Sequence, residues 1–288
     1  MEDLVEKILV TGATGNVGLE VVRALRGRGP QVVAAARNPE EFAGGFPDGV
    51  ERARLDFARP RTFGPVLDGV RALFLMRPPA LANTRKYIDP FVDAAEAAGV
   101  RRVVFLSLLG AEKNPLLPHR RVEKHLETSG LGWTFLRASF FMQNFSTIHR
   151  SEIAERGEIS VPAGRGRTSF VDVRDLAVVA AEALTNPGHE RGAYPLTGAE
   201  ALDYFEAAEV FSEVLGTRVV YTRPSVPEFV ADARRKGSPW GLALVMSGIY
   251  TAARLGLAGG QTPDLGRLLG RPPTTLRRFV EDHGDLWT

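Results

Sequence analysis

Residues Lys7 to Gly18 read KILVTGATGNVG, and this stretch decides the fold of the chain. It opens with the apolar residues of a buried strand and continues into three glycines spaced Gly-x-x-Gly-x-x-Gly. An amphipathic helical pattern follows over Asn16–Arg28. Strand, glycine turn and helix in this order are typical of the phosphate-binding turn in a dinucleotide-binding βαβ unit.

The glycines of this turn have separate physical roles. Gly12 allows a tight turn out of the strand, Gly15 lets backbone N–H groups approach a diphosphate, and Gly18 lets the helix pack close to the sheet. The helix N-terminus adds free N–H donors and a partial positive charge. The residues expected to bind the cofactor diphosphate are Gly12, Thr14, Gly15, Asn16, Val17 and Gly18. The alternative is a glycine-rich turn without a ligand.

The end of the second predicted strand indicates which dinucleotide binds. An NAD site places an Asp or Glu about 20 residues beyond the turn, where it bonds the ribose 2′-hydroxyl. Here that strand ends in Ala36 and Arg37, without an acid. A guanidinium suits a 2′-phosphate by charge and by bidentate geometry. Arg37 therefore predicts NADP(H), and the alternative is a solvated arginine at a strand end.

Two further strand ends are expected to contact the adenosine part of the cofactor, because ligands lie outside the carboxyl ends of such strands. Asp56 and Phe57 end the third strand and are placed to hold the adenine by a side-chain or backbone hydrogen bond. Met76 and Arg77 end the fourth strand and are expected to pass along the adenosine ribose.

The first two thirds of the chain alternate short apolar runs with helical patterns, which predicts parallel βαβ units with helices on both faces of a sheet. The fold class is therefore α/β, a doubly wound Rossmann sheet with a smaller, mainly helical C-terminal lobe. Strands are expected at 7–12, 32–37, 50–56, 72–78, 102–108 and 133–139, and helices at 16–28, 60–67, 81–98 and 118–128. The sheet domain is expected to span 1–145 with 168–198 returning to it, and the lobe to span 146–167 and 199–288.

Composition excludes several classes of function. The chain has 288 residues and no cysteine, so disulfides, thiol catalysis and zinc–thiolate sites are ruled out. Its five histidines show no metal-ligand spacing, and no metal is expected. The net charge of +2 is too small to indicate a nucleic-acid partner. The longest near-apolar run, Trp240–Ala253, is shorter than the ~20 residues of a membrane span and is read as a dimer face or a lid.

The acidic N-terminus runs directly into the first strand, which favours a protein without a signal peptide. Together with the absence of cysteine, this predicts a cytoplasmic location. The expected partner is a small-molecule substrate, with no nucleic acid and no membrane, and the chain is expected to be a monomer or homodimer.

At this point the chain resembles the NmrA-like group of the atypical short-chain dehydrogenase/reductase superfamily, close to its NAD(P)H:quinone oxidoreductase-type members. The resemblance covers nearly the whole chain. The matching stretches are Lys7–Gly18, Val32–Pro39, Gly99–Ser107, Ser129–Arg137, Phe140–Asn144, Ser169–Asp175, Leu196–Glu200, Gly216–Val220 and Gly270–Thr275. The resemblance implies a Rossmann domain that binds NADP(H) and a substrate cleft under the C-terminal lobe.

The resemblance also indicates where the chemistry would lie. Ordinary members of the superfamily use a Tyr-x-x-x-Lys pair, which this chain lacks. His119 and Glu123 stand at the corresponding positions, one helical turn apart, and Ser107 stands at the substrate-orienting serine position. The Glu123 carboxylate is expected to raise the imidazole pKa and to orient His119 as a donor to a reduced oxygen. The alternatives are a surface ion pair and a strand-end hydroxyl that caps a turn.

Aromatic residues after the sixth strand are candidates for the walls of the substrate site. Phe140 is expected to contact the nicotinamide. Phe141, Asn144 and Phe145 are expected to contact a flat substrate. The alternative for any one of the aromatic residues is a place in the hydrophobic core. The predicted function is an NADPH-dependent oxidoreductase that acts on a quinone or a similar flat carbonyl compound. The alternatives are an NADP(H)-binding redox sensor without turnover and a tailoring reductase of aromatic natural products.

Overall fold

The structure is a computed structural model that describes residues 6–42 and 45–288. The chain forms two compact units, each built from two segments. The first unit contains the chain up to Ala138 together with Val173–Leu196, and the second contains Ser139–Asp172 and Thr197–Thr288. The chain therefore changes unit after Ala138, Asp172 and Leu196, where the sequence-based division places the changes at 145, 168 and 198.

The first unit is built on a seven-stranded sheet in the order β10-β6-β5-β4-β1-β2-β3, and all neighbouring strands are parallel. This order and the surrounding helices confirm the predicted Rossmann fold. The strands are β1 Lys7–Thr11, β2 Gln31–Ala36, β3 Glu51–Arg54, β4 Val70–Leu75, β5 Arg102–Leu108, β6 Gly132–Ala138 and β10 Gly192–Leu196. The helices are α1 Asn16–Leu25, α2 Phe63–Leu67, α3 Thr84–Tyr87, α4 Asp89–Ala97, α5 Pro118–Thr128 and α8 Val173–Thr185.

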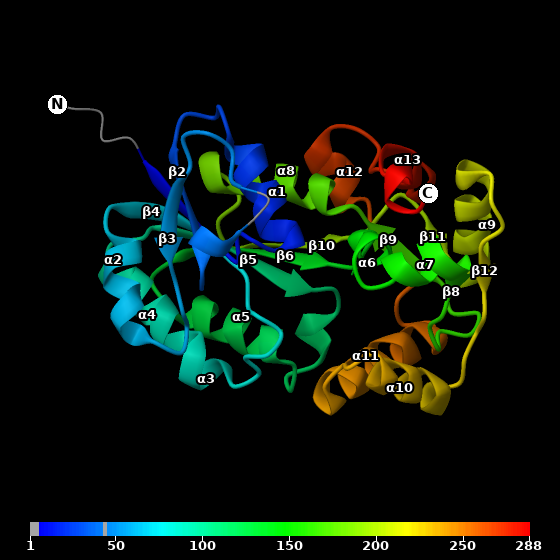
Figure 1. The fold of residues 1–288 in the computed structure, drawn as a ribbon. Helices are drawn as coiled ribbons and strands as arrows, with labels where there is room; N and C mark the ends of the chain where they lie inside the picture. Colours follow the sequence, from blue (N-terminus) through cyan, green and yellow to red (C-terminus); the bar gives the residue numbers. More distant parts are fainter. Residues whose placement is uncertain (1–5, 43–44) are drawn as a thin grey trace. The chain divides into compact units, whose positions relative to one another are not determined.

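Helices cover both faces of this sheet (Figure 1). Helices α1 and α8 pack together on one face, and α2, α4 and α5 lie on the other. The central strands are buried on both sides; Leu9, Leu73 and Val104 have no exposed surface. This two-sided burial explains why the strands read as continuous apolar runs rather than as alternating patterns.

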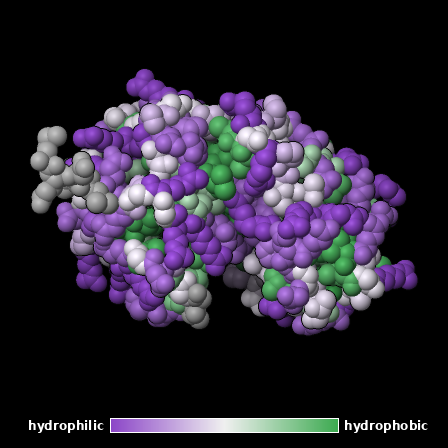
Figure 2. Space-filling view, turned by 90° about the horizontal axis from the view of Figure 1, so that it is seen from above, coloured by the Kyte–Doolittle hydropathy of each residue, from purple (hydrophilic) through white to green (hydrophobic). Residues whose placement is uncertain are grey.

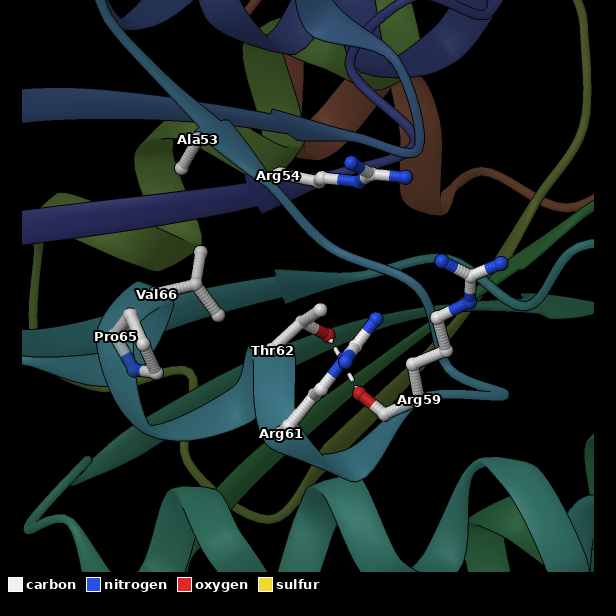
Figure 3. A pocket seen from close by; sticks show the side chains of 7 residues that line it. All are labelled: Ala53, Arg54, Arg59, Arg61, Thr62, Pro65 and Val66. Carbon is white, nitrogen blue, oxygen red and sulfur yellow. Dashed lines mark hydrogen bonds between the residues drawn. The ribbon is translucent and has the colours of Figure 1, made fainter.

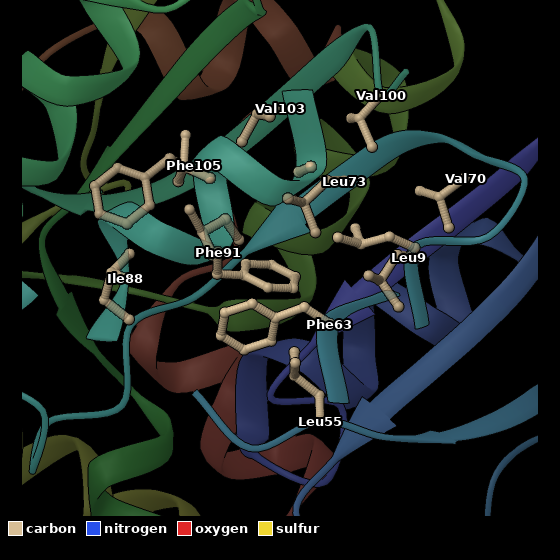
Figure 4. Packing of buried hydrophobic residues seen from close by; sticks show 14 of the residues in the cluster. Leu9, Leu55, Phe63, Val70, Leu73, Ile88, Phe91, Val100, Val103 and Phe105 are labelled. Atoms are coloured by element: carbon tan, nitrogen blue, oxygen red, sulfur yellow. The ribbon is translucent and has the colours of Figure 1, made fainter. Parts of the chain in front are cut away.

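The core on the α2, α4 and α5 face is closed by aromatic contacts (Figure 4). Phe91 of α4 meets Phe57 and Phe63 edge to face, with ring centroids 5.1 Å apart in both pairs. Such edge-to-face pairs are favourable beyond the area they bury. These contacts anchor the segment after β3, which carries the predicted cofactor residues Asp56 and Phe57.

Two predicted elements differ from the structure. The helix expected at 81–98 is split into α3 and α4, because Pro90 lies in the first turn of α4, where proline favours a helix start. The segment 168–198 was expected to return to the large sheet, but its first strand, β9 Thr168–Val171, belongs to a small sheet of the second unit. It is β10 that joins the large sheet, as an edge strand that tolerates Pro195.

The second unit combines two small sheets with short helices. One sheet has the order β11-β9-β7 and the other pairs β12 with β8. The remaining strands are β7 Phe140–Phe141, β8 Glu158–Ile159, β11 Ala201–Leu202 and β12 Val220–Tyr221. Its helices are α6 Gln143–Ser146, α7 Arg150–Arg156, α9 Tyr204–Leu215, α10 Val226–Arg235, α11 Trp240–Arg254, α12 Asp264–Leu269 and α13 Leu276–Asp282.

The face shown in Figure 2 is mostly hydrophilic, with small hydrophobic patches. Large apolar side chains that are exposed concentrate on α11, where Trp240 is 61% and Leu244 60% exposed. No described helix is both long enough and apolar enough to cross a membrane.

Candidate cofactor and active site

The glycine turn of the first unit has the close packing that its sequence predicts. Gly12 has a φ of +62°, a left-handed conformation that favours glycine. A Cβ atom on Gly12 would overlap the Met76 side chain, and one on Gly18 would overlap the Gly12 carbonyl group. On Gly15 it would lie 3.3 Å from the Gly12 oxygen. The turn therefore packs directly on α1 and leaves no room for larger residues.

The start of α1 is open to an anion. Gly15 is the N-cap residue, no side chain caps the helix, and no acid lies in the first turn. The N–H groups of a first helical turn have no acceptor within the helix, so they are available to a phosphate. Thr14 and Asn16 are exposed on this turn, and Val17 is buried beneath it. These residues fit the diphosphate of a nicotinamide dinucleotide, in a cradle that a Cβ atom would fill.

Thr11 ties the turn to the neighbouring strand. Its hydroxyl donates a hydrogen bond of 3.1 Å to the Phe74 oxygen and accepts one of 2.8 Å from the Met76 backbone N–H. The ends of β1 and β4 are thereby held side by side, and the Met76 side chain lies against Gly12. Sequence reasoning placed Met76 near the cofactor but missed Thr11, because a buried threonine in a strand gives no local signal.

The other predicted adenosine contacts lie at the ends of β2 and β3. Arg37 is exposed directly after β2, and within residues 6–42 and 45–288 it has no ion pair or hydrogen bond from its side chain. Asp56 is half-buried; its carboxylate accepts the Ala58 N–H at 2.9 Å and lies 3.3 Å from the Arg59 guanidinium. The Phe57 side chain is buried in the core, so only its backbone is placed to meet an adenine.

Arg77 organises the loop that follows β4. Its guanidinium donates to the carbonyl oxygens of Pro78 and Leu81, at 2.9 and 3.2 Å. Its Nε is buried without a partner among the described residues, and burial lowers the pKa of Arg77. A buried donor without a partner costs folding free energy. Arg77 therefore keeps one N–H donor that no described residue uses.

Glu123 is the centre of a buried polar cluster. Its side chain has no exposed surface, and it receives hydrogen bonds from three elements. Ser107 of β5 donates at 2.7 Å, Arg137 of β6 donates at 2.9 and 3.0 Å, and Arg120 of α5 donates at 2.9 Å. Burial alone would raise the pKa of Glu123, but the hydrogen bonds from Arg137 and Ser107 and the Arg137 charge outweigh it and lower the pKa. Glu123 is therefore an ionised carboxylate saturated by donors.

This cluster contradicts the expected pairing of Glu123 with His119. The pKa of His119 is not raised but lowered, to about 3, first by burial and then by the Arg77 charge, while Glu123 only partly opposes them. The His119 Nδ1 is buried and has no hydrogen-bond partner in the described part of the chain. His119 is therefore a neutral imidazole. The reason for the error is that Glu123 turns toward β5 and β6, where the Ser107 hydroxyl and the Arg137 guanidinium donate to it.

Three other residues belong to the same region. Ser107 is 1% exposed and donates its hydroxyl hydrogen to Glu123, so it is part of the polar cluster. Arg137 also lies 3.3 Å from the Glu112 carboxylate. His125 is half-buried, and its ring lies 2.7 Å from the exposed Asp93 carboxylate. Sequence reasoning missed Arg120, although its position three residues before Glu123 on one helix is a recognisable signal.

The predicted substrate residues lie in the second unit. Phe140 and Phe141 form β7 and are half-buried, as is Asn144. Phe145 is 1% exposed, and its ring centroid lies 5.2 Å from those of Phe170 and Phe211. The burial of Phe145 favours the core alternative for this residue. The roles of the other three remain predictions.

The described residues contain no group of three or more His, Asp or Glu side chains that could hold a metal ion.

Comparison with known proteins places these features in a family. The model of the NmrA-like family matches residues 5–247. The NAD(P)H azoreductase of Xenophilus azovorans is 34% identical over 280 residues, covering 96% of this chain and 97% of that protein. Quinone oxidoreductase 2 of Escherichia coli (strain K12) is 30% identical over 278 residues, covering 95% and 97%.

A solved structure supports the same likeness in three dimensions. The Citrobacter sp. triphenylmethane reductase complexed with NADP(H) aligns with a TM-score of 0.85 and 31% sequence identity. The alignment covers 96% of this chain and 99% of that one.

Proposed function

Because the chain belongs to the NmrA-like family, we propose that it transfers reducing equivalents from NADPH to a quinone or a similarly flat, conjugated acceptor. At the coarser level it is an NAD(P)H-dependent oxidoreductase, like the azoreductase, quinone oxidoreductase and dye reductase that it resembles. The choice of acceptor rests on the residues that replace the Tyr and Lys of ordinary short-chain dehydrogenases.

The residues that would hold the cofactor come from the ends of the parallel strands. The open N-terminus of α1 and the Gly12–Gly18 turn would bind the diphosphate, and Arg37 would bind the 2′-phosphate. Asp56, the Phe57 backbone and Met76 would contact the adenosine part. When bound, NADPH supplies the hydride, so the protein's own task is to orient the reactants and exclude water.

The observation that carries the proposal is the lack of an effective acid at positions 119 and 123. Glu123 is ionised and saturated by Ser107, Arg120 and Arg137, and His119 has a pKa of about 3. A general acid works best when its pKa lies near the working pH, and neither group meets this condition. The site is therefore poorly suited to protonate a strongly basic alkoxide.

Reduction of a quinone does not require a general acid of this kind. Its reduction leaves a phenol-type oxygen with a pKa of about 10, as in tyrosine, and water can protonate this oxygen after release. The neutral imidazole of His119 can still donate or accept one hydrogen bond and so orient a carbonyl oxygen. Ser107 and Glu123 would act as positioning residues that fix α5 and thereby His119. Phe140, Phe141 and Asn144 would form the walls of the acceptor site.

The test is NADPH oxidation, followed by loss of nicotinamide absorbance, with a panel of quinones, an azo dye, a triarylmethane dye and simple ketones. We expect turnover with quinones and none with simple ketones. Faster turnover of ketones than of quinones would overturn the proposed acceptor class. Tight NADPH binding without turnover of any acceptor would favour the redox sensor, and turnover of aromatic natural products alone would favour the tailoring reductase.

Two histidines on α5 provide a matched pair of variants. His119→Ala is expected to lower kcat about tenfold or more while NADPH binding stays unchanged, since it removes one oriented hydrogen bond. His125→Ala, at a half-buried position of the same helix that pairs with Asp93, is the control and should leave kcat unchanged. Equal activity of both variants would make His119 a structural residue. Size-exclusion chromatography would test the expected monomer or homodimer.

A further inference from the structure

A pocket of about 410 Å³ lies beside the edge strand of the large sheet, between β3 and α2 (Figure 3). It belongs entirely to the first unit. Its lining residues are Ala53, Arg54, Arg59, Arg61, Thr62, Pro65 and Val66. None of the residues that form the glycine turn lines it, so it is separate from the diphosphate cradle.

Three arginines give this pocket its character. Arg54, Arg59 and Arg61 line it, and the lining contains no acidic residue. Arg59 is paired with Asp56 at 3.3 Å, outside the lining. The side chains of Arg54 and Arg61 are exposed and have no ion pair or hydrogen bond within the described ranges. In Figure 3 the guanidinium groups of Arg54 and Arg59 point to the same side of the pocket. Two uncompensated positive charges beside a third create a strongly electropositive concavity.

The position of the pocket connects it to the adenosine end of the cofactor site. Arg54 ends β3 and is the register partner of Ala36, the residue immediately before Arg37. Asp56, which is predicted to meet the adenine, forms the ion pair with Arg59. Ligands of doubly wound sheets lie beyond the carboxyl ends of the strands, and both β2 and β3 end here.

We propose that Arg54, Arg59 and Arg61 form an anion subsite for the phosphate monoester of a nucleotide-class ligand. Arginine is suited to this ligand, because its planar guanidinium binds phosphate oxygens in a bidentate manner. The volume exceeds that of a single phosphate group and lies at the lower end of the ~300–1,000 Å³ typical of small-molecule sites. The pocket therefore has room for a phosphate together with the group attached to it.

Two kinds of molecule can supply the phosphate ester that binds in this pocket. The neighbouring position of Arg37 favours the 2′-phosphate of NADPH, and this arm rests on the proposed use of NADPH. The other source is a separate phosphorylated small molecule that binds while the cofactor site is filled. Both use the same guanidinium chemistry, and direct binding measurements distinguish them without any need for turnover.

The experiment is isothermal titration calorimetry on Arg54→Gln and Arg61→Gln in the full chain. NADPH and NADH are titrated separately, and inorganic pyrophosphate is titrated into protein saturated with NADPH. The matched control is Arg52→Gln, on the same strand, which removes the same charge outside the pocket; the Arg52 side chain lies over the Phe46 ring at 5.9 Å. All three arginines are exposed, so the variants keep the fold.

If the 2′-phosphate is the ligand, both pocket variants weaken NADPH about tenfold while NADH and the Arg52 control stay at wild-type affinity. If the ligand is a separate phosphate ester, the NADPH-saturated wild-type protein binds pyrophosphate and the pocket variants bind it about tenfold more weakly. If both pocket variants bind NADPH, NADH and pyrophosphate as the wild-type protein does, the proposal is overturned. A lack of quinone turnover leaves these binding results intact, so the two failures are distinguishable.

Discussion

Arg37 is the residue on which the choice between the two nicotinamide dinucleotides depends. It is exposed and its side chain is unpaired in the described part of the chain, so its full charge is available. Replacing Arg37 by Glu places a negative charge against a 2′-phosphate. NADPH affinity is expected to fall about 100-fold or more, while NADH affinity changes little. Fluorescence titration with both dinucleotides checks this; equal losses for the two would contradict the 2′-phosphate role.

His119 makes stability depend on pH in a defined direction. Its pKa falls from 6.5 to about 3 on folding, mainly through burial. Between these values the unfolded chain binds a proton that the folded protein does not, so the free energy of unfolding decreases as the pH falls through this window. Above pH 6.5 the contribution is fully present. His119→Gln is expected to flatten this part of the pH dependence in urea unfolding series, whereas a slope identical to that of the wild type would show that His119 does not titrate there.

The contrast between Gly12–Gly18 and His119 shows which residues sequence can place. The packing of Gly15 and Gly18 could be predicted because their Cβ clearance depends on Gly12, a few residues away, and φ is a local property. The state of His119 could not, because its pKa depends first on burial and then on Arg77 and Glu123, which tertiary packing positions. A histidine–glutamate spacing of four residues gives proximity on a helix but does not give the direction of either side chain.

At the scale of the element, the junction between β1 and α1 tolerates little change. A Cβ atom at position 18 would overlap the Gly12 carbonyl, which also forms the turn. Gly18→Ala is expected to cost about 2 kcal/mol of stability and to abolish dinucleotide binding, since the helix must move away from the turn. Gly248→Ala is the control, inside α11, where a Cβ atom meets open space. It should stabilise the protein by up to about 1 kcal/mol, because alanine favours a helix. Thermal unfolding with and without NADPH separates the two effects, and intact NADPH binding by Gly18→Ala would contradict the packing role.

The Glu123 cluster joins β5, β6 and α5 by charge, beside the apolar contacts that Val122 and Leu126 make in the core. Removing one partner of a buried ion pair typically costs about 3–5 kcal/mol. Glu123→Ala is expected to lie in that range, since it leaves Arg137 and Arg120 with only the more exposed Glu112 and Glu127 as partners. Glu127→Ala is the control: this carboxylate also pairs with Arg120 but is 32% exposed and should cost less than about 1 kcal/mol. Chemical unfolding measures both; similar costs would show that burial of Glu123 contributes nothing.

At the scale of the whole molecule, the first unit is completed by Val173–Leu196, which in the sequence lies between the two segments of the second unit. Helix α8 packs on α1, and β10 pairs with β6. A chain of residues 1–138 would leave the β6 edge and one face of the sheet exposed, and we expect it to aggregate. Joining 173–196 to 138 through a flexible linker should give a soluble, cooperatively melting protein. A soluble, cooperatively folded 1–138 fragment would contradict this dependence.

The same topology explains how much of the fold was predictable. The alternation of strands and helices predicted the Rossmann sheet, because parallel strands and their crossover helices leave regular patterns. It did not predict that β9 joins a small sheet while β10 joins the large one. Both are short strands, and their partners are fixed by tertiary packing.

The donors around position 123 also bear on attempts to redesign this chain. Introducing the tyrosine and lysine of ordinary short-chain dehydrogenases at positions 119 and 123 would bring an ammonium group against the Arg120 and Arg137 guanidinium groups. Three cations would then share a space that excludes water. A grafted alcohol-dehydrogenase dyad would therefore need both arginines exchanged together with positions 119 and 123.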